Sequence, residues 1–270
     1  MALSDYTQNT AIGVFDSGLG GLSVWRELVK QIPQRSVYYV SDSAYCPYGP
    51  RPVSEVIARG QLISQFLIDK GCGIIVLACN TATAAAISSL RQSFSLPFVG
   101  MEPAVKPAAL HSRTDVVGVL ATQGTFKGSL YKETSQRFAS HVQVIETVGA
   151  GLVELIEQGR LDDLETNALL KRYIDPMLEA GADHLVLGCT HYPFLIPAIE
   201  NITKGRMQIV DPAPAVALHT AQLAASLPLA LEPVAYHFFA TGSIDALRQR
   251  AEALPLPKKP CFFTEELLIF

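Results

Sequence analysis

The sequence lacks any segment that would commit it to a membrane or to secretion. Its longest apolar stretch, residues 214–231, is interrupted by His219, Gln222 and Pro228, and therefore indicates a helix followed by a loop. The amino-terminal residues 1–5 carry neither a basic start nor an apolar signal core. We therefore expect a cytoplasmic, reducing location for this protein.

Cysteine is scarce, and neither sign of charge is in large excess. The 270 residues contain five cysteines, at positions 46, 72, 79, 189 and 261, and no C-x-x-C pair. An odd number of cysteines without close pairs is typical of free thiols rather than of a disulfide framework. The net charge is only −4, which argues against nucleic acid as the main partner.

Nucleotide-binding signatures are also missing. The glycine-rich turn at residues 16–21 follows the first apolar run, but it contains neither G-x-G-x-x-G nor G-K-[ST]. One interpretation of this turn is a simple helix N-cap, because Asp, Ser and Gly are common there. The other is a binding site, in which Asp16 orients a thiol or an ammonium group and the backbone N–H groups bind a carboxylate.

What the sequence does contain is an alternation of strand-like and helix-like segments, with 49% apolar and 17% charged residues. That composition supports a substantial core, and the alternation predicts an α/β protein with parallel strands. Strands are expected at residues 11–15, 37–40, 74–78, 116–120, 142–147, 185–187, 207–210 and 236–240. Helices are expected at residues 21–32, 53–70, 83–92, 126–138, 152–158, 164–180, 194–201, 216–225 and 244–253.

The pattern begins again halfway along the chain. Residues 12–18 resemble residues 117–124, and the offset from Gly13 to Gly118 is 118 − 13 = 105. We therefore predict two similar domains, each a mostly parallel sheet flanked by helices. Residues 1–100 plus 212–270 would form the first, and residues 101–211 the second. Because ligands bind outside the carboxyl ends of parallel strands, the active site is expected in the cleft between the domains.

Two cysteines occupy matching positions in this pattern. Cys79 follows one strand-like run and Cys189 another, at a separation of 189 − 79 = 110 residues, so they form no local metal knuckle or redox pair. Both runs lead into a helix-like segment, and a helix N-terminus lowers a thiol pKa from its usual value of about 8.5. Two such thiols at equivalent strand ends indicate one site with two facing acid/base groups.

Other interpretations of these cysteines remain open. A cysteine that ends a strand is often a small core residue. His191, two residues after Cys189, can move protons at that thiol, but a structural loop histidine fits the spacing equally well. The pair Cys189 and His191 also suits a thiol hydrolase. A binding module is a further alternative, in which Cys79, Cys189, His191 and Asp16 hold a metal.

Two further segments carry candidate residues. In the loop at residues 41–49, Tyr48 and the Gly49 amide can line a polar pocket, although the same loop also suits a surface turn. Glu154 lies on a short amphipathic segment, where a carboxylate usually faces solvent. It becomes a site residue only if that helix borders the cleft.

Together these motifs resemble the bacterial glutamate racemases of the cofactor-independent aspartate/glutamate racemase superfamily. The matching segments run in order through most of the chain, and the pair of cysteine motifs is the specific part. They are residues 13–24, 47–49, 78–83, 118–122 and 187–193.

The resemblance implies that L- and D-glutamate are interconverted, supplying D-glutamate for peptidoglycan, without a cofactor or a metal. It implies that Cys189 deprotonates L-glutamate and Cys79 deprotonates D-glutamate, assisted by His191 and Asp16 respectively, with Glu154 supporting the histidine. It also implies a homodimer, with no membrane or nucleic-acid partner. The implied substrate contacts are Asp16, Ser17, Pro47, Tyr48, Gly49, Asn80, Thr81, Thr122, Thr190 and His191.

The implied chemistry is physically coherent, because inverting a stereocentre needs a proton acceptor on one face and a donor on the other. No pyridoxal lysine motif is evident, so fixed hydrogen-bond donors would have to stabilise the carbanion with water excluded. One departure from the family is Cys46, which stands before Pro47 where a plain apolar residue is expected. Racemisation of another substrate, such as aspartate or a hydantoin, is the nearest rival.

Overall fold

Two parallel sheets form the framework of the protein. The structure is a computed structural model that describes residues 9–139, 141–254 and the backbone of 261–266. The strands are β1 (Ala11–Asp16), β2 (Val37–Ser41), β3 (Cys72–Leu77), β4 (Phe98–Gly100), β5 (Val116–Ala121), β6 (Gln143–Val148), β7 (His184–Gly188), β8 (Gln208–Val210), β9 (Tyr236–Ala240) and β10 (Cys261–Glu266).

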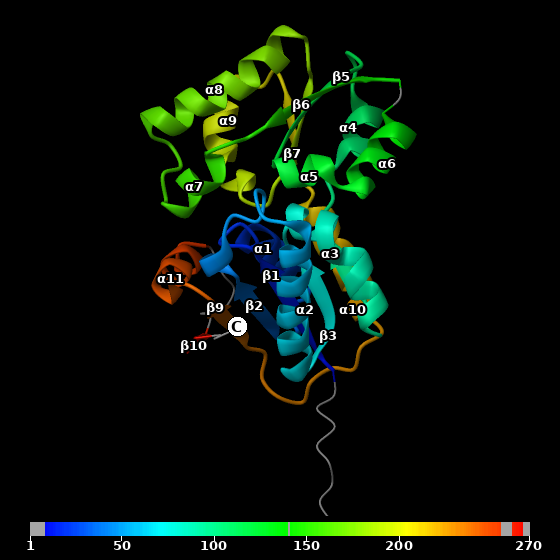
Figure 1. Ribbon diagram of the computed structural model, residues 1–270, viewed down its shortest axis with the longest axis vertical. Helices are drawn as coiled ribbons and strands as arrows, with labels where there is room; N and C mark the ends of the chain where they lie inside the picture. Colours follow the sequence, from blue (N-terminus) through cyan, green and yellow to red (C-terminus); the bar gives the residue numbers. More distant parts are fainter. Residues whose placement is uncertain (1–8, 140, 255–260, 267–270) are drawn as a thin grey trace, which may run out of the picture.

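Helices connect these strands and cover both faces of each sheet (Figure 1). They are α1 (Leu22–Gln31), α2 (Val53–Asp69), α3 (Asn80–Ser93), α4 (Val105–His111), α5 (Gln123–Lys127), α6 (Ser129–Phe138), α7 (Leu152–Glu157), α8 (Leu164–Glu179), α9 (Ile196–Thr203), α10 (Ala213–Ala224) and α11 (Ile244–Glu252), with short 3-10 turns η1 (Ser43–Tyr45) and η2 (Tyr192–Leu195). None of these helices is long and apolar enough to span a bilayer.

The first sheet has the strand order β10-β9-β2-β1-β3-β4, and the second has the order β6-β5-β7-β8. Every pairing in both sheets is parallel. The order β2-β1-β3-β4 is the same as β6-β5-β7-β8, so β3 and β7 occupy equivalent places. The predicted α/β architecture of two similar parallel sheets is therefore confirmed.

The central strands are apolar throughout because helices bury them from both sides. All residues of β1 and β3 are buried. Helices α1 and α10 contribute to the core on one face of the first sheet, and α2 and α3 to the core on the other. Helices α8 and α9 cover one face of the second sheet, and α4 and α6 cover the opposite face.

Some elements differ from the sequence-based expectation. The proline-rich passage after residue 96 contains the short strand β4 and the helix α4, and neither was expected. The helix expected at residues 126–138 is two helices, because Gly128 has the extended backbone of a helix boundary (φ −64°, ψ 139°). Strand β10 was also unexpected, and it pairs with β9 at the edge of the first sheet.

Candidate active site

The carboxyl ends of the two sheets face one another (Figure 1). Hydrogen bonds join the loops on the two sides. The Thr81 hydroxyl lies 2.8 Å from that of Thr122, and Ser23 Oγ donates to the Thr190 carbonyl oxygen at 2.9 Å. These loops leave β1, β3, β5 and β7, which are the strands beside the point where each sheet reverses its winding. Ligands of open α/β sheets bind at such points.

Cys79 lies two residues after β3 and is the N-cap residue of α3. Its sulfur accepts the Ala82 amide at 3.5 Å, and its thiol is positioned to donate to Ser17 Oγ at 3.7 Å. Burial raises the pKa of this thiol, and the nearby charges of Asp16 and Cys189 raise it further. The side chain is 6% exposed. Burial thus outweighs the helix N-terminus, which the sequence led us to expect would lower this pKa, and the protonated thiol is favoured.

Asp16 is the last residue of β1, and its charge acts on the Cys79 thiol. One carboxylate oxygen accepts the backbone amides of Gly18 and Gly21 at 3.1 and 3.0 Å, because the glycine-rich turn curls around it. Its other oxygen accepts the Thr190 hydroxyl at 3.4 Å. Burial raises the pKa of Asp16, while the charge of His191 and the two amides act in the opposite direction. Asp16 therefore links the first sheet to the loop that follows β7.

Cys189 follows β7 and is 7% exposed. Its sulfur lies 3.8 Å from Nδ1 of His191. The other ring nitrogen, Nε2, donates to Glu157 Oε1 at 2.6 Å. Burial lowers the pKa of His191, but hydrogen bonds to Cys189, Cys46 and Glu157 raise it well above its ordinary value. The arrangement therefore favours an imidazolium beside the Cys189 sulfur.

The carboxylate beside His191 is Glu157 and not Glu154, which the family resemblance suggested. Both lie on α7, but only Glu157 hydrogen-bonds the imidazole among the described residues. The Leu19 amide also donates to Glu157 Oε1, at 2.7 Å, which fixes the carboxylate against the first sheet. Glu154 instead lines a cavity of about 210 Å³ together with Pro47, Gly49 and Thr122.

Tyr48 is positioned by a buried ion pair. Its hydroxyl donates to Asp42 Oδ2 at 2.5 Å, and Arg59 binds both carboxylate oxygens of Asp42 at 2.9 and 2.7 Å. The ring of Tyr48 is buried. Asp42 follows β2, as the sequence indicated, and its described role is to hold this loop. The sequence did not single out Arg59, because an arginine within an amphipathic helix normally faces solvent.

Asn80 is the least satisfied polar side chain of the site. It is the first residue of α3 and is 3% exposed, yet neither its Nδ2 nor its Oδ1 has a hydrogen-bond partner. A buried amide without partners costs free energy unless a ligand satisfies it. Ser17, Thr81 and Thr190 are buried close to the same strand ends. The structure thus gathers hydrogen-bonding groups around the two thiols.

Comparison with known proteins identifies this arrangement. The family model for Asp/Glu/Hydantoin racemase matches residues 12–220.

The chain belongs to the Asp/Glu/Hydantoin racemase family. It is therefore a racemase, and the matched region contains both sheet ends described above.

Individual relatives agree with this assignment. The chain is 50% identical over 213 residues to a glutamate racemase from a Roseiflexus species, a match that covers 78% of each chain. Its fold is similar to that of glutamate racemase isoform RacE1 from Bacillus anthracis, with a TM-score of 0.83, 29% identity and coverage of 96% and 98% of the two chains. It is also similar to Escherichia coli glutamate racemase in complex with L-glutamate and the activator UDP-MurNAc-ala, with a TM-score of 0.80, 32% identity and coverage of 89% and 95%.

Proposed function

We propose that this racemase interconverts L- and D-glutamate by proton transfer at the α-carbon between two thiols, Cys79 and Cys189. The observation that carries the proposal is their equivalence. Each cysteine follows the same strand of two sheets with the same strand order. The resemblance to curated glutamate racemases supports glutamate as the substrate.

The two thiols differ in a way that suits opposite roles. Cys189 faces a histidine that favours its charged form and is suited to remove the α-proton of L-glutamate. Cys79 is kept protonated by burial and is suited to deliver a proton to the opposite face. Reaction from D-glutamate uses the same groups in reverse, with Asp16 assisting Cys79 and His191 assisting Cys189.

Stabilisation of the carbanion falls to neutral donors and helix N-termini. The Asn80 side chain has no hydrogen-bond partner, and the hydroxyls of Ser17, Thr81 and Thr190 would turn toward substrate from their present partners. Fixed donors in a site closed to water interact strongly with developing negative charge. Tyr48 and the Pro47-Tyr48-Gly49 loop close the side of the site formed by the first sheet.

The biological setting is part of the proposal. D-glutamate produced here would supply peptidoglycan synthesis in the cytoplasm, and the enzyme would act as a homodimer without a cofactor. Residues 1–100 with 212–270 and residues 101–211 would form two domains that separate to admit substrate.

Solvent deuterium exchange separates the two half-reactions. In heavy water, the C189S variant should lose α-proton exchange with L-glutamate more than with D-glutamate, and C79S should show the reverse. Replacement of either cysteine by alanine should abolish racemisation, whereas C72S should racemise normally because Cys72 begins β3 at the opposite end of the sheet. Full racemisation by C79A or C189A would refute the two-thiol scheme.

The rival activities are tested with the same protein. Faster racemisation of aspartate than of glutamate, or turnover of a hydantoin, would reassign the substrate. An acyl-enzyme on Cys189 detected by mass spectrometry would instead indicate a thiol hydrolase.

A further inference from the structure

A third thiol lies beside the proposed machinery. Cys46 precedes the Pro47-Tyr48-Gly49 loop and is half-buried, and its sulfur lies close to His191 and Glu157. One ligand atom from each of Cys46, Glu157 and His191 lies within 4.8 Å of the other two. The two-thiol scheme assigns no role to Cys46.

We propose that Cys46, Glu157 and His191 form an inhibitory binding site for a divalent transition-metal ion of the zinc type. Sulfur, imidazole nitrogen and carboxylate oxygen are the donors that zinc prefers, and three protein ligands with one open position are a common zinc arrangement. With metal–ligand bonds of about 2.0–2.3 Å, a tetrahedral ion needs ligand atoms roughly 3.3–3.8 Å apart. The ligand atoms lie within 4.8 Å of one another, and His191 Nε2 is 2.6 Å from Glu157 Oε1, so binding requires adjustments of about 1 Å.

The loop after β1 leaves room for the side chains of Cys46 and Glu157. A Cβ at Gly18 would stand 2.8 Å from the Cys46 sulfur and 2.2 Å from Glu157 Oε1, so only glycine leaves room for both. The Leu19 amide orients the carboxylate from behind. Second-shell donors of this kind hold metal ligands in register.

A cavity that neither Cys79 nor Cys189 lines reaches one of the three proposed ligands. Glu157 lines a cavity of about 330 Å³ that also borders Gln158, Gln249 and Arg250, between α7 and α11. The Glu157 side chain is 22% exposed there. Arg250, the one cationic side chain of that lining, donates to the Ile156 carbonyl oxygen at 3.2 Å.

Metal binding would block the reaction through His191. Because Glu157 meets Nε2, an ion shared by these two residues bonds Nε2 and displaces its proton to solvent. The Cys46 thiol also releases its proton to solvent as it becomes a ligand. The imidazole is then neutral, with its remaining proton on Nδ1 facing Cys189, and it can no longer become an imidazolium. The metal-bound His191 then carries no imidazolium charge beside Cys189.

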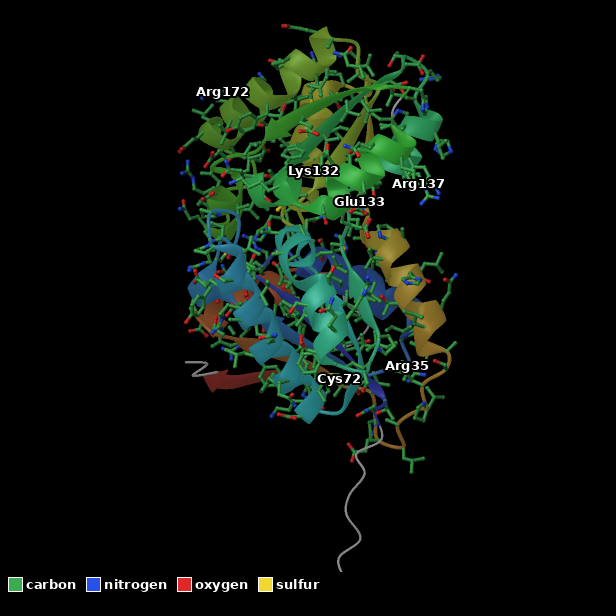
Figure 2. The ribbon with its side chains drawn as sticks, turned by 45° about the vertical axis from the view of Figure 1, so that its right-hand side comes forward. Arg35, Cys72, Lys132, Glu133, Arg137 and Arg172 are labelled. Atoms are coloured by element: carbon green, nitrogen blue, oxygen red, sulfur yellow. The ribbon has the colours of Figure 1, made fainter. Side chains whose placement is uncertain are left out.

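Cobalt(II) binding can be measured by absorption spectroscopy, independently of catalytic activity. Titration of the purified full chain with cobalt chloride should produce a sulfur-to-cobalt charge-transfer band in the near ultraviolet, which zinc then abolishes. The band should be lost in C46S and retained in C189S and C72S. Figure 2 shows the control residue Cys72 near the bottom of the first sheet, far from the junction of the two sheets. Circular dichroism verifies that each variant is folded.

Inhibition provides the second arm. Zinc should inhibit wild-type racemisation, and EDTA should reverse the inhibition. The zinc concentration for half-inhibition should rise more than about tenfold in C46S, measured against that variant's own uninhibited rate. A missing cobalt band in the wild type, a band that persists in C46S, or a band that disappears in C189S would overturn the proposal. These spectra stand even if glutamate is not the substrate, so failure of the metal site and failure of the racemase assignment are distinguishable.

Discussion

The charge of His191 depends on the residues that contact its two nitrogens. Nδ1 faces the Cys189 sulfur, and Nε2 faces Glu157 while the Gly20 amide nitrogen lies 3.2 Å from it. The carboxylate raises the pKa of His191 together with the two thiols. At this scale, Glu157 is one of three groups that favour the protonated form of His191.

Replacing Glu157 by glutamine should therefore impair the Cys189 half-reaction. An imidazolium is lost as pH rises through its pKa, so a lower His191 pKa moves the basic limb of the kcat/KM profile to lower pH. At pH values above the His191 pKa, each unit by which that pKa falls lowers kcat/KM about tenfold. The measurement is the pH profile of racemisation from L-glutamate. E154Q is the matched control, because Glu154 does not contact the ring, and an unshifted profile in E157Q would contradict this role.

The sequence could not distinguish these two glutamates. Glu154 and Glu157 are three residues apart on α7, so they lie on the same side of the helix. Which carboxylate reaches His191 depends on how α7 docks against the loop after β1, where the Leu19 amide meets Glu157. A contact between residues 138 positions apart is not encoded in a local pattern. The two cysteines were predictable because each ends an apolar strand and precedes a helix.

Asn80 offers a second test at the residue scale. Because its amide atoms have no partners, N80A should cost the folded protein almost nothing in free energy of unfolding. If the amide binds substrate, the same change removes a hydrogen bond to a charged group, worth about 1.5–3 kcal/mol, and lowers kcat/KM roughly tenfold to a hundredfold. Chemical denaturation and steady-state kinetics measure the two effects. A stability loss without a kinetic loss would instead identify Asn80 as structural.

At the scale of elements, the loop after β1 packs directly against the loop after β7. An added Cβ at Gly20 would lie 2.3 Å from His191 Nδ1, whereas one at Gly60 in α2 would make ordinary contacts of 3.5 Å with Ala86 and Leu90. The two glycines therefore have different functions. Gly20 permits the close approach of the two sheets. Gly60 is a position within a helix that has room for a larger side chain.

We expect G20A to displace His191 and lower kcat at least about tenfold, as the loss of one positioned acid/base group does. The same substitution at Gly60 should leave kcat unchanged and stabilise the protein by about 0.5–1 kcal/mol through helix propensity. Thermal denaturation and kinetics of the pair measure both outcomes. Normal activity in G20A would show that the loop yields without moving the histidine.

Element prediction succeeded where the apolar pattern is continuous and failed where it is short. Strand β9 was predicted with its observed bounds, and α2 to within one residue. Strand β4 has only three residues and lies among prolines, so the sequence contains no alternation from which to infer it. It exists because its backbone pairs with β3, a tertiary cause that local propensity does not contain.

For the whole molecule, the important fact is that the site is closed. Both thiols are almost inaccessible to solvent. Hydrogen bonds between side chains of the two halves hold the surrounding loops together. We expect an amino acid to reach them when these contacts break and the sheets separate. Closure also explains why fixed neutral donors suffice, because water would otherwise compete for them.

Alkylation of the thiols measures this opening. Iodoacetamide should modify Cys79 and Cys189 only in the open form, and a ligand that binds the closed form lowers the open population by a factor of about 1 + [L]/Kd. Saturating D-glutamate at 100 times its Kd should therefore slow modification about a hundredfold. Peptide mass spectrometry follows each cysteine separately. Cys72, which is fully buried, should remain unmodified throughout and so verify that the protein stays folded. Equal rates with and without D-glutamate would mean that the thiols are reached without separation of the sheets.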